Sequence, residues 1–271
     1  MAGHVHEDQR RQLTAHGARH RPFVLGEATW AEVKATRFEV AVLPWGATEA
    51  HNTHLPYATD NFETDAVAAG AAEHAWNRGA PVLVLPCVPF GVNTGQREVP
   101  FCLNMMPGTQ TAVIRDLLPS LENHGIRKLV ILNGHGGNDF KQIIRELQPS
   151  TSILLVQVNW WQVVPVSRFF EAPGDHAGEL ETSAMLHLRP ELVRPLDSAG
   201  PGKARSHRIQ AFREGWAWMP RPWTRVTDDT GVGDPAKATA EKGARFYDAV
   251  TEAIGGFLDD LAKADPNDLF E

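Results

Sequence analysis

The sequence predicts an α/β fold, a single domain with a mostly parallel central sheet flanked by helices. Two observations support this prediction. Four short apolar runs are strand candidates, and helical patterns lie between them. The runs are continuous rather than alternating, which is typical of strands that are covered on both faces. These strand candidates are Glu39–Leu43, Pro81–Pro86, Lys128–Leu132 and Ser152–Val158.

The helical patterns differ in composition but share apolar residues at helical spacing. They are Thr64–Trp76, which is rich in alanine, Thr109–Asn123, Asn138–Leu147 and Glu179–Leu188. We expect a last helix to begin at Asp234-Pro235, because Asp is a good N-cap and Pro suits the first helical position. Its apolar stripe consists of Phe246, Val250, Ile254, Phe257 and Leu261.

One stretch does not fit this alternation. Residues 198–233 are irregular and rich in Gly, Pro, Arg and Trp. We expect them to form a long excursion over the surface or into a partner subunit.

Composition excludes several classes of protein. The 271 residues are 42% hydrophobic, enough for one large domain or two small ones. No linker divides the chain, so we place a single domain at residues 21–271, after a polar segment at residues 1–20. The net charge of −7 and the lack of a basic run argue against a nucleic-acid partner. The polar N-terminus is unlike a secretory signal, and no apolar run is long enough to span a membrane. Cys87 and Cys102 are expected to be reduced thiols of a soluble, cytoplasmic protein.

The first candidate site follows the first predicted strand. Glu49, His51, His54 and Asp60 lie within a dozen residues, a mixture of imidazole and carboxylate that suits divalent metals. Residues two apart in an extended segment point the same way, so Glu49 and His51 can face one point. A polar surface loop is the alternative interpretation.

A second candidate lies in Asn133-Gly-His135-Gly-Gly-Asn138, directly after the strand candidate Lys128–Leu132. Its glycines allow close approach of the backbone to a ligand, and His135 is suited to bind metal. A phosphate loop is a weak alternative because the P-loop lysine is missing. A plain glycine-rich turn is the other alternative.

A third candidate joins a loop to a helix at Asp175-His176-Ala-Gly-Glu179-Leu-Glu181. The helix dipole favours anions at its N-terminus, which is a sufficient structural reason for one of the glutamates. It does not explain the Asp175-His176 pair. Such a pair suits proton transfer by an imidazole that a carboxylate tunes.

Together the three loops favour a metal site over three unrelated polar loops. The carboxylates and histidines exceed the needs of one ion, so two ions are plausible, with Asp60 as the candidate bridging ligand. Two ions hold a bridging hydroxide at neutral pH and polarise a carbonyl, which indicates hydrolysis of an amide-like bond. Serine catalysis is disfavoured because the chain has no Gly-x-Ser-x-Gly motif, and neither cysteine has a nucleophile signature.

These motifs resemble those of the creatininase (creatinine amidohydrolase) family, from Leu25 to the C-terminal helix. The resemblance rests on Leu43-Pro-Trp-Gly-Ala-Thr-Glu49-Ala-His51, Asp60, Pro107-Gly-Thr109, Asn133-Gly-His135 and His176-Ala-Gly-Glu-Leu-Glu181-Thr-Ser. It implies a single three-layer α/β domain, homo-oligomers that are often hexamers, and a dinuclear site of Zn²⁺, Mn²⁺ or Fe²⁺ that hydrolyses C–N bonds. It also implies metal ligands at Glu49, His51, Asp60 and His135, and an acid/base histidine at His176 beside Asp175.

The sequence departs from creatininase itself in two ways. Creatininase has a metal-binding Glu where this chain has Gly137, and Glu181 is the expected replacement; a single-metal site is the alternative. Creatininase also closes two tryptophans over its substrate. Trp161 matches one of them, whereas Ala172 stands near the other. Packing in the core or at an interface is the alternative role of Trp161.

The segment Gly91–Arg97 also differs from creatininase, so we expect another substrate than creatinine. Its candidate substrate-binding residues are Asn93, Gln96 and Arg97, with a solvated loop as the alternative. The sequence therefore predicts a hydrolase that uses one or two divalent ions on a C–N or similar carbonyl bond of a small, cyclic substrate. A peptidase or deformylase of the same family, or a non-catalytic metal-binding oligomer, is the alternative.

Overall fold

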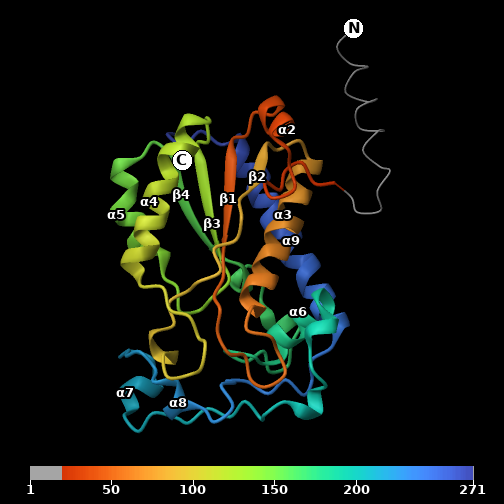
Figure 1. The fold of residues 1–271 in the computed structure, drawn as a ribbon, viewed down its shortest axis with the longest axis vertical. Coiled ribbons are helices and arrows are strands. Elements are labelled where there is room, and N and C mark those ends of the chain that lie inside the picture. Colours follow the sequence, from red (N-terminus) through yellow and green to blue (C-terminus); the bar gives the residue numbers. More distant parts are fainter. Residues whose placement is uncertain (1–19, 271) are drawn as a thin grey trace.

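The computed structural model describes residues 20–270, so all but the last residue of the predicted polar segment 1–20 lies outside the described residues. A sheet of four parallel strands in the order β2-β1-β3-β4 forms the centre (Figure 1). This confirms the predicted α/β fold with a parallel sheet. The strands are β1 (Val40–Trp45), β2 (Val82–Val84), β3 (Lys128–Asn133) and β4 (Leu154–Asn159).

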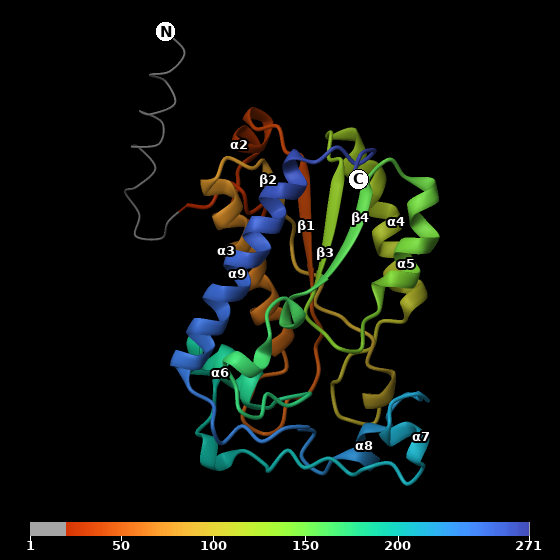
Figure 2. The ribbon, with the colours of Figure 1, turned by 180° about the vertical axis from the view of Figure 1, so that it is seen from behind.

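Helices cover both faces of the sheet. One face is covered by α3 (Thr59–Asn77) and α9 (Ala240–Lys263), against which α6 (Glu179–Leu188) packs, and the other by α4 (Pro107–Asn123) and α5 (Phe140–Leu147) (Figures 1 and 2). The continuous apolar strands supply both cores. Val40 and Val42 of β1 join the cluster beneath α3 and α9, whereas Ala41 and Leu43 join the cluster beneath α4 and α5. The lack of alternation in the sequence thus reflects burial on two sides.

The remaining helices are short. Helix α2 (Trp30–Ala35) begins with a capping box of Thr29 and Glu32. Residues 198–233, which we call the strap, contain α7 (Gln210–Arg213) and α8 (Trp223–Val226). The strap runs across the foot of the molecule in Figures 1 and 2, below the carboxyl ends of the strands. The predicted excursion over the surface is therefore present, and it covers the edge of the sheet where sites are expected.

Some predicted boundaries were wrong. Strand β1 continues through Pro44 to Trp45 instead of stopping before them, and α3 begins at Thr59, so it includes Asp60. The last helix begins at Ala240, with Thr239 as its N-cap, and not at Asp234. The Asp234 carboxylate accepts a hydrogen bond from the backbone N–H of Ala236 at 2.9 Å. Asp-Pro therefore forms a local turn just before the helix, which is the other role in which Asp is favoured.

The register of the sheet places the predicted loops together. Trp45, the last residue of β1, pairs with Asn133, the last residue of β3. The loops that carry Glu49 and His135 thus start side by side at the carboxyl edge of the sheet. Between residues 20 and 270, no helix is long and apolar enough to cross a membrane. Cys87 and Cys102 are free thiols, as expected.

Candidate metal centre

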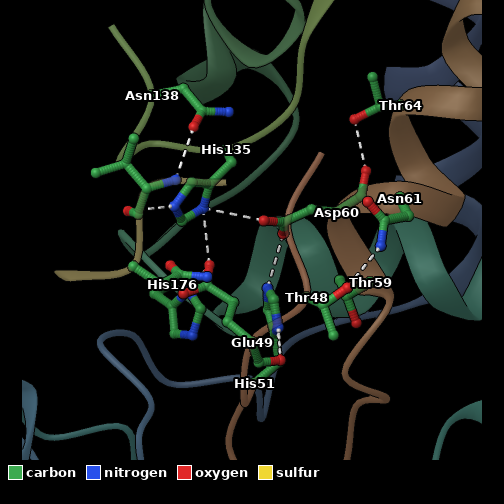
Figure 3. Close-up of polar contacts among 12 residues, drawn as sticks. Thr48, Glu49, His51, Thr59, Asp60, Asn61, Thr64, His135, Asn138 and His176 are labelled. Atoms are coloured by element: carbon green, nitrogen blue, oxygen red, sulfur yellow. Dashed lines mark hydrogen bonds and ion pairs between the residues drawn. The ribbon is translucent and has the colours of Figure 1, made fainter. Parts of the chain in front are cut away.

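Five buried or half-buried side chains from four segments meet at the carboxyl edge of the sheet. Figure 3 labels four of them, Glu49, His51, Asp60 and His135. Glu49 and His51 come from the loop after β1, and His135 from the loop after β3. Asp60 and Glu181 lie in the first turns of α3 and α6, where the helix dipole favours a carboxylate. The first four are almost completely buried, while the Glu181 side chain is 21% exposed.

Asp60 is at the centre of this arrangement. Its Oδ1 atom lies 2.9 Å from Nε2 of His51, and its Oδ2 atom lies 3.0 Å from Nδ1 of His135. Two groups of potential ligand atoms therefore share Asp60, one with Glu49 and His135 and the other with His51 and Glu181. Within each group the ligand atoms lie within 4.8 Å of one another, the spacing that a single ion requires. The geometry suits two neighbouring ions with a shared carboxylate.

Backbone carbonyls fix the orientation of the imidazole rings. His51 donates its Nδ1–H to the carbonyl of Glu49 at 3.1 Å, and His135 donates its Nε2–H to the carbonyl of Val92 at 3.1 Å. Each ring thus turns its other nitrogen toward the carboxylates. Metal-binding histidines in proteins are held in the same way, by a hydrogen bond from the nitrogen that does not bind the ion.

The protonation of each of these groups depends on the charges of its neighbours. Burial lowers the pKa of His51, but the Asp60 carboxylate outweighs it and raises that pKa to about 10. Burial likewise opposes a charged His135, yet Glu49 and Asp60 raise its pKa well above the usual value. The pKa of Asp60 is lowered in spite of burial, because of the positive charges of His51 and His135. Without metal, the two imidazoles thus keep protons where positive charge is needed to balance buried carboxylates.

The backbone around the histidines is unusual. Asn52 and Ala177, the residues after His51 and His176, have φ values of 54° and 52°. This left-handed conformation costs a residue with a side chain about 1–3 kcal/mol. After β3, a Cβ atom at Gly134 would lie 1.6 Å from the Thr64 hydroxyl oxygen, so glycine is required for the loop to pass α3. The backbone next to His51, His135 and His176 therefore adopts conformations or close contacts that most residue types would not tolerate.

His176 lies against the same cluster. Its ring stacks on that of His51, with centroids 4.2 Å apart, and Nε2–H donates to the carbonyl of Ala50 at 2.8 Å. The Nδ1 atom lies 3.7 Å from Oε1 of Glu49. The neighbouring carboxylate, Asp175, is engaged elsewhere, because its Oδ2 atom accepts a hydrogen bond from Arg221 at 2.6 Å. The carboxylate that faces the His176 ring is therefore that of Glu49, and not the adjacent one in the sequence.

A cavity of about 250 Å³ opens onto these groups. The strap supplies its outer wall through Trp218, Met219, Arg221 and Trp223, whereas Asn93 and Gln96 supply part of the inner wall. Gln96 donates to the second oxygen of Glu49. Of the predicted substrate-binding residues, Asn93 and Gln96 thus lie at the cavity.

Two other predicted substrate-binding residues do not line the cavity. Trp161 packs edge-on against Trp160, with ring centroids 6.2 Å apart, at the border of the apolar core beneath α9. This is the packing role that the sequence left as the alternative. Arg97 is exposed and lines a neighbouring surface depression of the strap. The 3₁₀ turn Thr94–Gln96 ends before Arg97, and its last residue, Gln96, faces inward instead.

The sequence profile of the creatininase family, described as creatinine amidohydrolase, matches residues 26–258. The chain belongs to the creatininase family. Curated relatives within it have different activities. The mycofactocin precursor peptide peptidase of Mycobacterium tuberculosis (strain H37Rv) is 29% identical over 243 residues, 84% of this chain and 87% of the relative. The creatinine amidohydrolase of Pseudomonas putida is 30% identical over 194 residues, 62% of this chain and 73% of the relative.

Solved creatininase-family structures share the fold. A putative creatinine amidohydrolase from Bacteroides fragilis superposes with a TM-score of 0.87 at 44% identity, covering 93% of this chain and 100% of that chain. A creatininase variant of the Zn–Zn type superposes with a TM-score of 0.74 at 26% identity, covering 90% and 100%.

The structure explains how this creatininase-family chain accommodates glycine at position 137. A Cβ atom there would lie 2.3 Å from the carbonyl oxygen of Val92 and 2.5 Å from Nε2 of His135, so the loop leaves no room for a glutamate. Glu181 lies beside His51 instead, with Oε2 4.0 Å from Nε2 of that imidazole. It adds a third potential ligand to the group that otherwise contains only His51 and Asp60.

Sequence reasoning did not identify several residues beside the centre. The strap residues carry no periodic pattern, and they follow the ligand motifs by many residues. Glu63, one turn after Asp60 in α3, is 1% exposed, and neither carboxylate oxygen has a hydrogen-bond partner within the described part of the chain. Burial, together with the charges of Glu181 and Asp60, raises its pKa well above the usual value. A charged residue inside an alanine-rich buried helix was the available signal, because such residues are rarely buried without a reason.

Proposed function

We propose that this protein is a metal-dependent hydrolase of a C–N amide bond. Glu49, Asp60 and His135 hold one divalent ion, and His51, Asp60 and Glu181 hold a second. The observation that carries this proposal is the shared position of Asp60 between two groups of potential ligand atoms. The zinc pair of the related creatininase variant supports it.

The residues present fit such ions. Each imidazole turns toward the carboxylates the nitrogen that its backbone hydrogen bond leaves unused. The Oδ2 atom of Asp60 has no hydrogen-bond partner among the described residues, although Nδ1 of His135 is 3.0 Å away. An oxygen and nitrogen donor set of this kind suits Zn²⁺, Mn²⁺ and Fe²⁺. Divalent ions held there supply Lewis acidity for a carbonyl group and lower the pKa of a water molecule.

The protein's own groups perform the remaining tasks. His176 lines the cavity, and Nε2 is committed to the Ala50 carbonyl. Its Nδ1 atom is therefore the one available to move a proton to the leaving nitrogen. Gln96 holds Glu49 by donating to its second oxygen. The Trp223 ring, 7% exposed, meets the His176 ring edge-on at 5.3 Å, so it shields this imidazole from water.

Metal analysis and two variants test this function. Purified protein should contain Zn²⁺, Mn²⁺ or Fe²⁺ by mass spectrometry, or gain thermal stability and amidase activity when one is added. His135→Ala should lose metal. His176→Ala should keep its metal and lose about 10²–10⁴-fold in kcat, the usual contribution of a general acid–base group. Protein that holds no metal under any of these conditions, or two variants that stay equally active, would refute the proposal.

The predicted homo-oligomer also remains a proposal. Phe101 and Trp216 are 84% and 75% exposed, and large exposed apolar side chains are typical of interaction surfaces. Light scattering coupled to size-exclusion chromatography tests it: a monomeric mass at micromolar concentration would contradict the prediction.

A further inference from the structure

The strap differs in charge from the rest of the protein. The chain as a whole has a net charge of −7. Within the strap the balance is reversed, because its lysine and arginine residues outnumber its three carboxylates, Glu214, Asp228 and Asp229. The cationic residues of the strap are Lys203, Arg205, Arg208, Arg213, Arg221 and Arg225. Since this segment covers the cavity, its charge acts on molecules that enter.

Arg221 is the cationic strap residue that lines the cavity itself. Its guanidinium carbon lies 4.6 Å from the ring centroid of Trp223, so the group is held over a buried aromatic ring. Within residues 20–270 its single side-chain hydrogen bond runs from Nη1 to Oδ2 of Asp175, at 2.6 Å. A guanidinium has five N–H donors. Most of the donors of Arg221 are therefore free for a ligand.

The backbone of Arg221 is fixed against the inner wall of the cavity. A Cβ atom at Gly95 would lie 2.1 Å from the carbonyl oxygen of Arg221, so only glycine allows the two segments to approach this closely. Three residues after Arg221, the Thr224 hydroxyl donates a hydrogen bond to the Glu98 carboxylate at 2.8 Å. The guanidinium thus has a defined position before a ligand arrives, which reduces the entropic cost of binding.

We propose that Arg221 is a specificity-determining residue that binds a carboxylate of the substrate. The substrate class is an amide that carries a carboxylate near the scissile bond, as in an N-acyl amino acid or the free C-terminus of a peptide. This inference rests on the proposed amide hydrolysis at the metal centre. Arg221 pairs with a carboxylate through two parallel N–H donors, and this geometry makes such pairs specific.

The existing pair with Asp175 does not block this role. The side chains of Arg221 and Asp175 are 38% and 57% exposed, and exposed pairs of this kind contribute little to stability. Asp175 orients the guanidinium through one nitrogen and leaves the others available. A neighbouring depression, which shares Arg221, Trp218 and Met219 with the cavity, gives room for the part of the substrate beyond the carboxylate.

Matched substrate pairs test this inference on the metal-loaded protein. N-acetyl amino acids and short peptides are compared with their C-terminal carboxamides, which lack the negative charge. The proteins are the wild type, Arg221→Gln, Arg221→Lys and the control Arg225→Gln, which removes an exposed charge from the same strap outside the cavity. The kcat/KM of each pair is measured, together with calorimetric binding of the N-acetyl amino acids.

We expect the wild type to prefer the acids. Arg221→Gln should lower kcat/KM for the acids about 10–100-fold, mainly through KM, which corresponds to about 1.4–2.8 kcal/mol. It should change kcat/KM for the carboxamides less than about threefold. For the acids, kcat/KM of Arg221→Lys should lie between those of the wild type and Arg221→Gln. The control Arg225→Gln should change kcat/KM for neither the acids nor the carboxamides. A preference for N-acetyl amino acids over peptide acids would identify the small substrates as the source of the carboxylate, and the reverse would identify peptides.

The measurements separate the role of Arg221 from the hydrolase activity. Equal turnover of acids and carboxamides, or equal losses for both in Arg221→Gln, would overturn the role of Arg221 and leave the hydrolase intact. If no substrate is turned over, calorimetry decides. Acid binding that depends on Arg221 then supports the carboxylate site without the hydrolase, whereas binding that is unchanged in Arg221→Gln, or absent, overturns it.

Discussion

Oδ2 of Asp60 lies 3.0 Å from Nδ1 of His135, although the two residues belong to different layers of the molecule. Asp60 lies in the first turn of a helix on one face of the sheet, and His135 follows a central strand. The second oxygen of Asp60 contacts His51 at 2.9 Å. One carboxylate therefore joins two imidazoles that each have their own additional carboxylate neighbour, Glu49 or Glu181.

This relationship predicts different metal stoichiometries for two variants. Asp60→Asn removes the shared ligand, so both ions should bind more weakly. The affinity for each ion should fall by more than the roughly 10–100-fold that is lost when a residue that only hydrogen-bonds to a metal ligand is removed. Glu181→Gln should weaken only the ion of the His51 group. Metal content after dialysis, measured by mass spectrometry, should thus fall from two ions to none in Asp60→Asn and to one in Glu181→Gln.

A matched control is Glu252→Gln on the exposed side of α9, which should retain the full metal content. If Asp60→Asn keeps one tightly bound ion while Glu181→Gln keeps both, Asp60 is not shared. Such a result would favour a single ion at Glu49 and His135.

Much of this centre was predictable because its signals are local. Apolar runs mark the strands, and the ligand motifs follow them directly. Because sites lie at the carboxyl edge of parallel strands, the sequence predicts that Glu49 and His135 lie close together. The start of α3 was missed because Asp60 lies in its first turn without an N-cap hydrogen bond from Ala58. The fold class was predictable from the order of the strands and helices and from the burial of the strands on both faces.

The cavity wall was not predictable from such patterns. Trp161 and Arg97 were expected there, and the strap residues Trp218 and Trp223 line the cavity instead. An irregular segment has no period that reveals which side faces inward. Its position is set by contacts distant in the sequence, such as the hydrogen bond from the Asn52 N–H to the Thr230 hydroxyl at 2.9 Å.

Metal binding should release protons. In the metal-free protein the pKa of His51 is raised from 6.5 to about 10, so this imidazole is charged at neutral pH, whereas a ligand must be neutral. A raised histidine pKa stabilises the folded metal-free state fully below pH 6.5, and that stabilisation is lost as the pH rises through 10. The increase in Tm on metal addition should therefore grow between pH 6.5 and 9.

Calorimetric titration with metal in two buffers of different ionisation enthalpy measures the released protons directly. We expect at least one proton per protein at pH 7, and fewer as the pH approaches 10. The same observed enthalpy in both buffers at pH 7 would show that His51 is already neutral, contrary to this prediction.

Glu63 should destabilise the metal-free protein at neutral and alkaline pH. Its pKa is raised well above 4.5, so the folded state keeps a proton that the unfolded state releases, and stability falls as the pH rises above 4.5. Glu63→Gln should match the wild type near pH 4. At pH 8 it should be more stable by at least about 1.4 kcal/mol, the free energy that corresponds to one unit of pKa difference between the folded and unfolded states.

Urea unfolding of metal-free protein at both pH values measures this difference. Glu252→Gln, an exposed change on α9, should stay within about 0.5 kcal/mol of the wild type at both. A Glu63→Gln variant that is less stable at pH 8 than the wild type would show that Glu63 is ionised and has a partner.

Gly95→Ala should detach the strap from the inner wall of the cavity. The added methyl group would lie 2.1 Å from the carbonyl oxygen of Arg221, and this is a backbone atom, so the strap must move. Its lysine and arginine residues should then become better trypsin sites, and cleavage within residues 203–225 should accelerate severalfold at equal global stability. Gly108→Ala is the matched control, because nothing lies within 4 Å of its added Cβ. Equal trypsin cleavage rates in the two variants would mean that the contact with Gly95 does not hold the strap over the cavity.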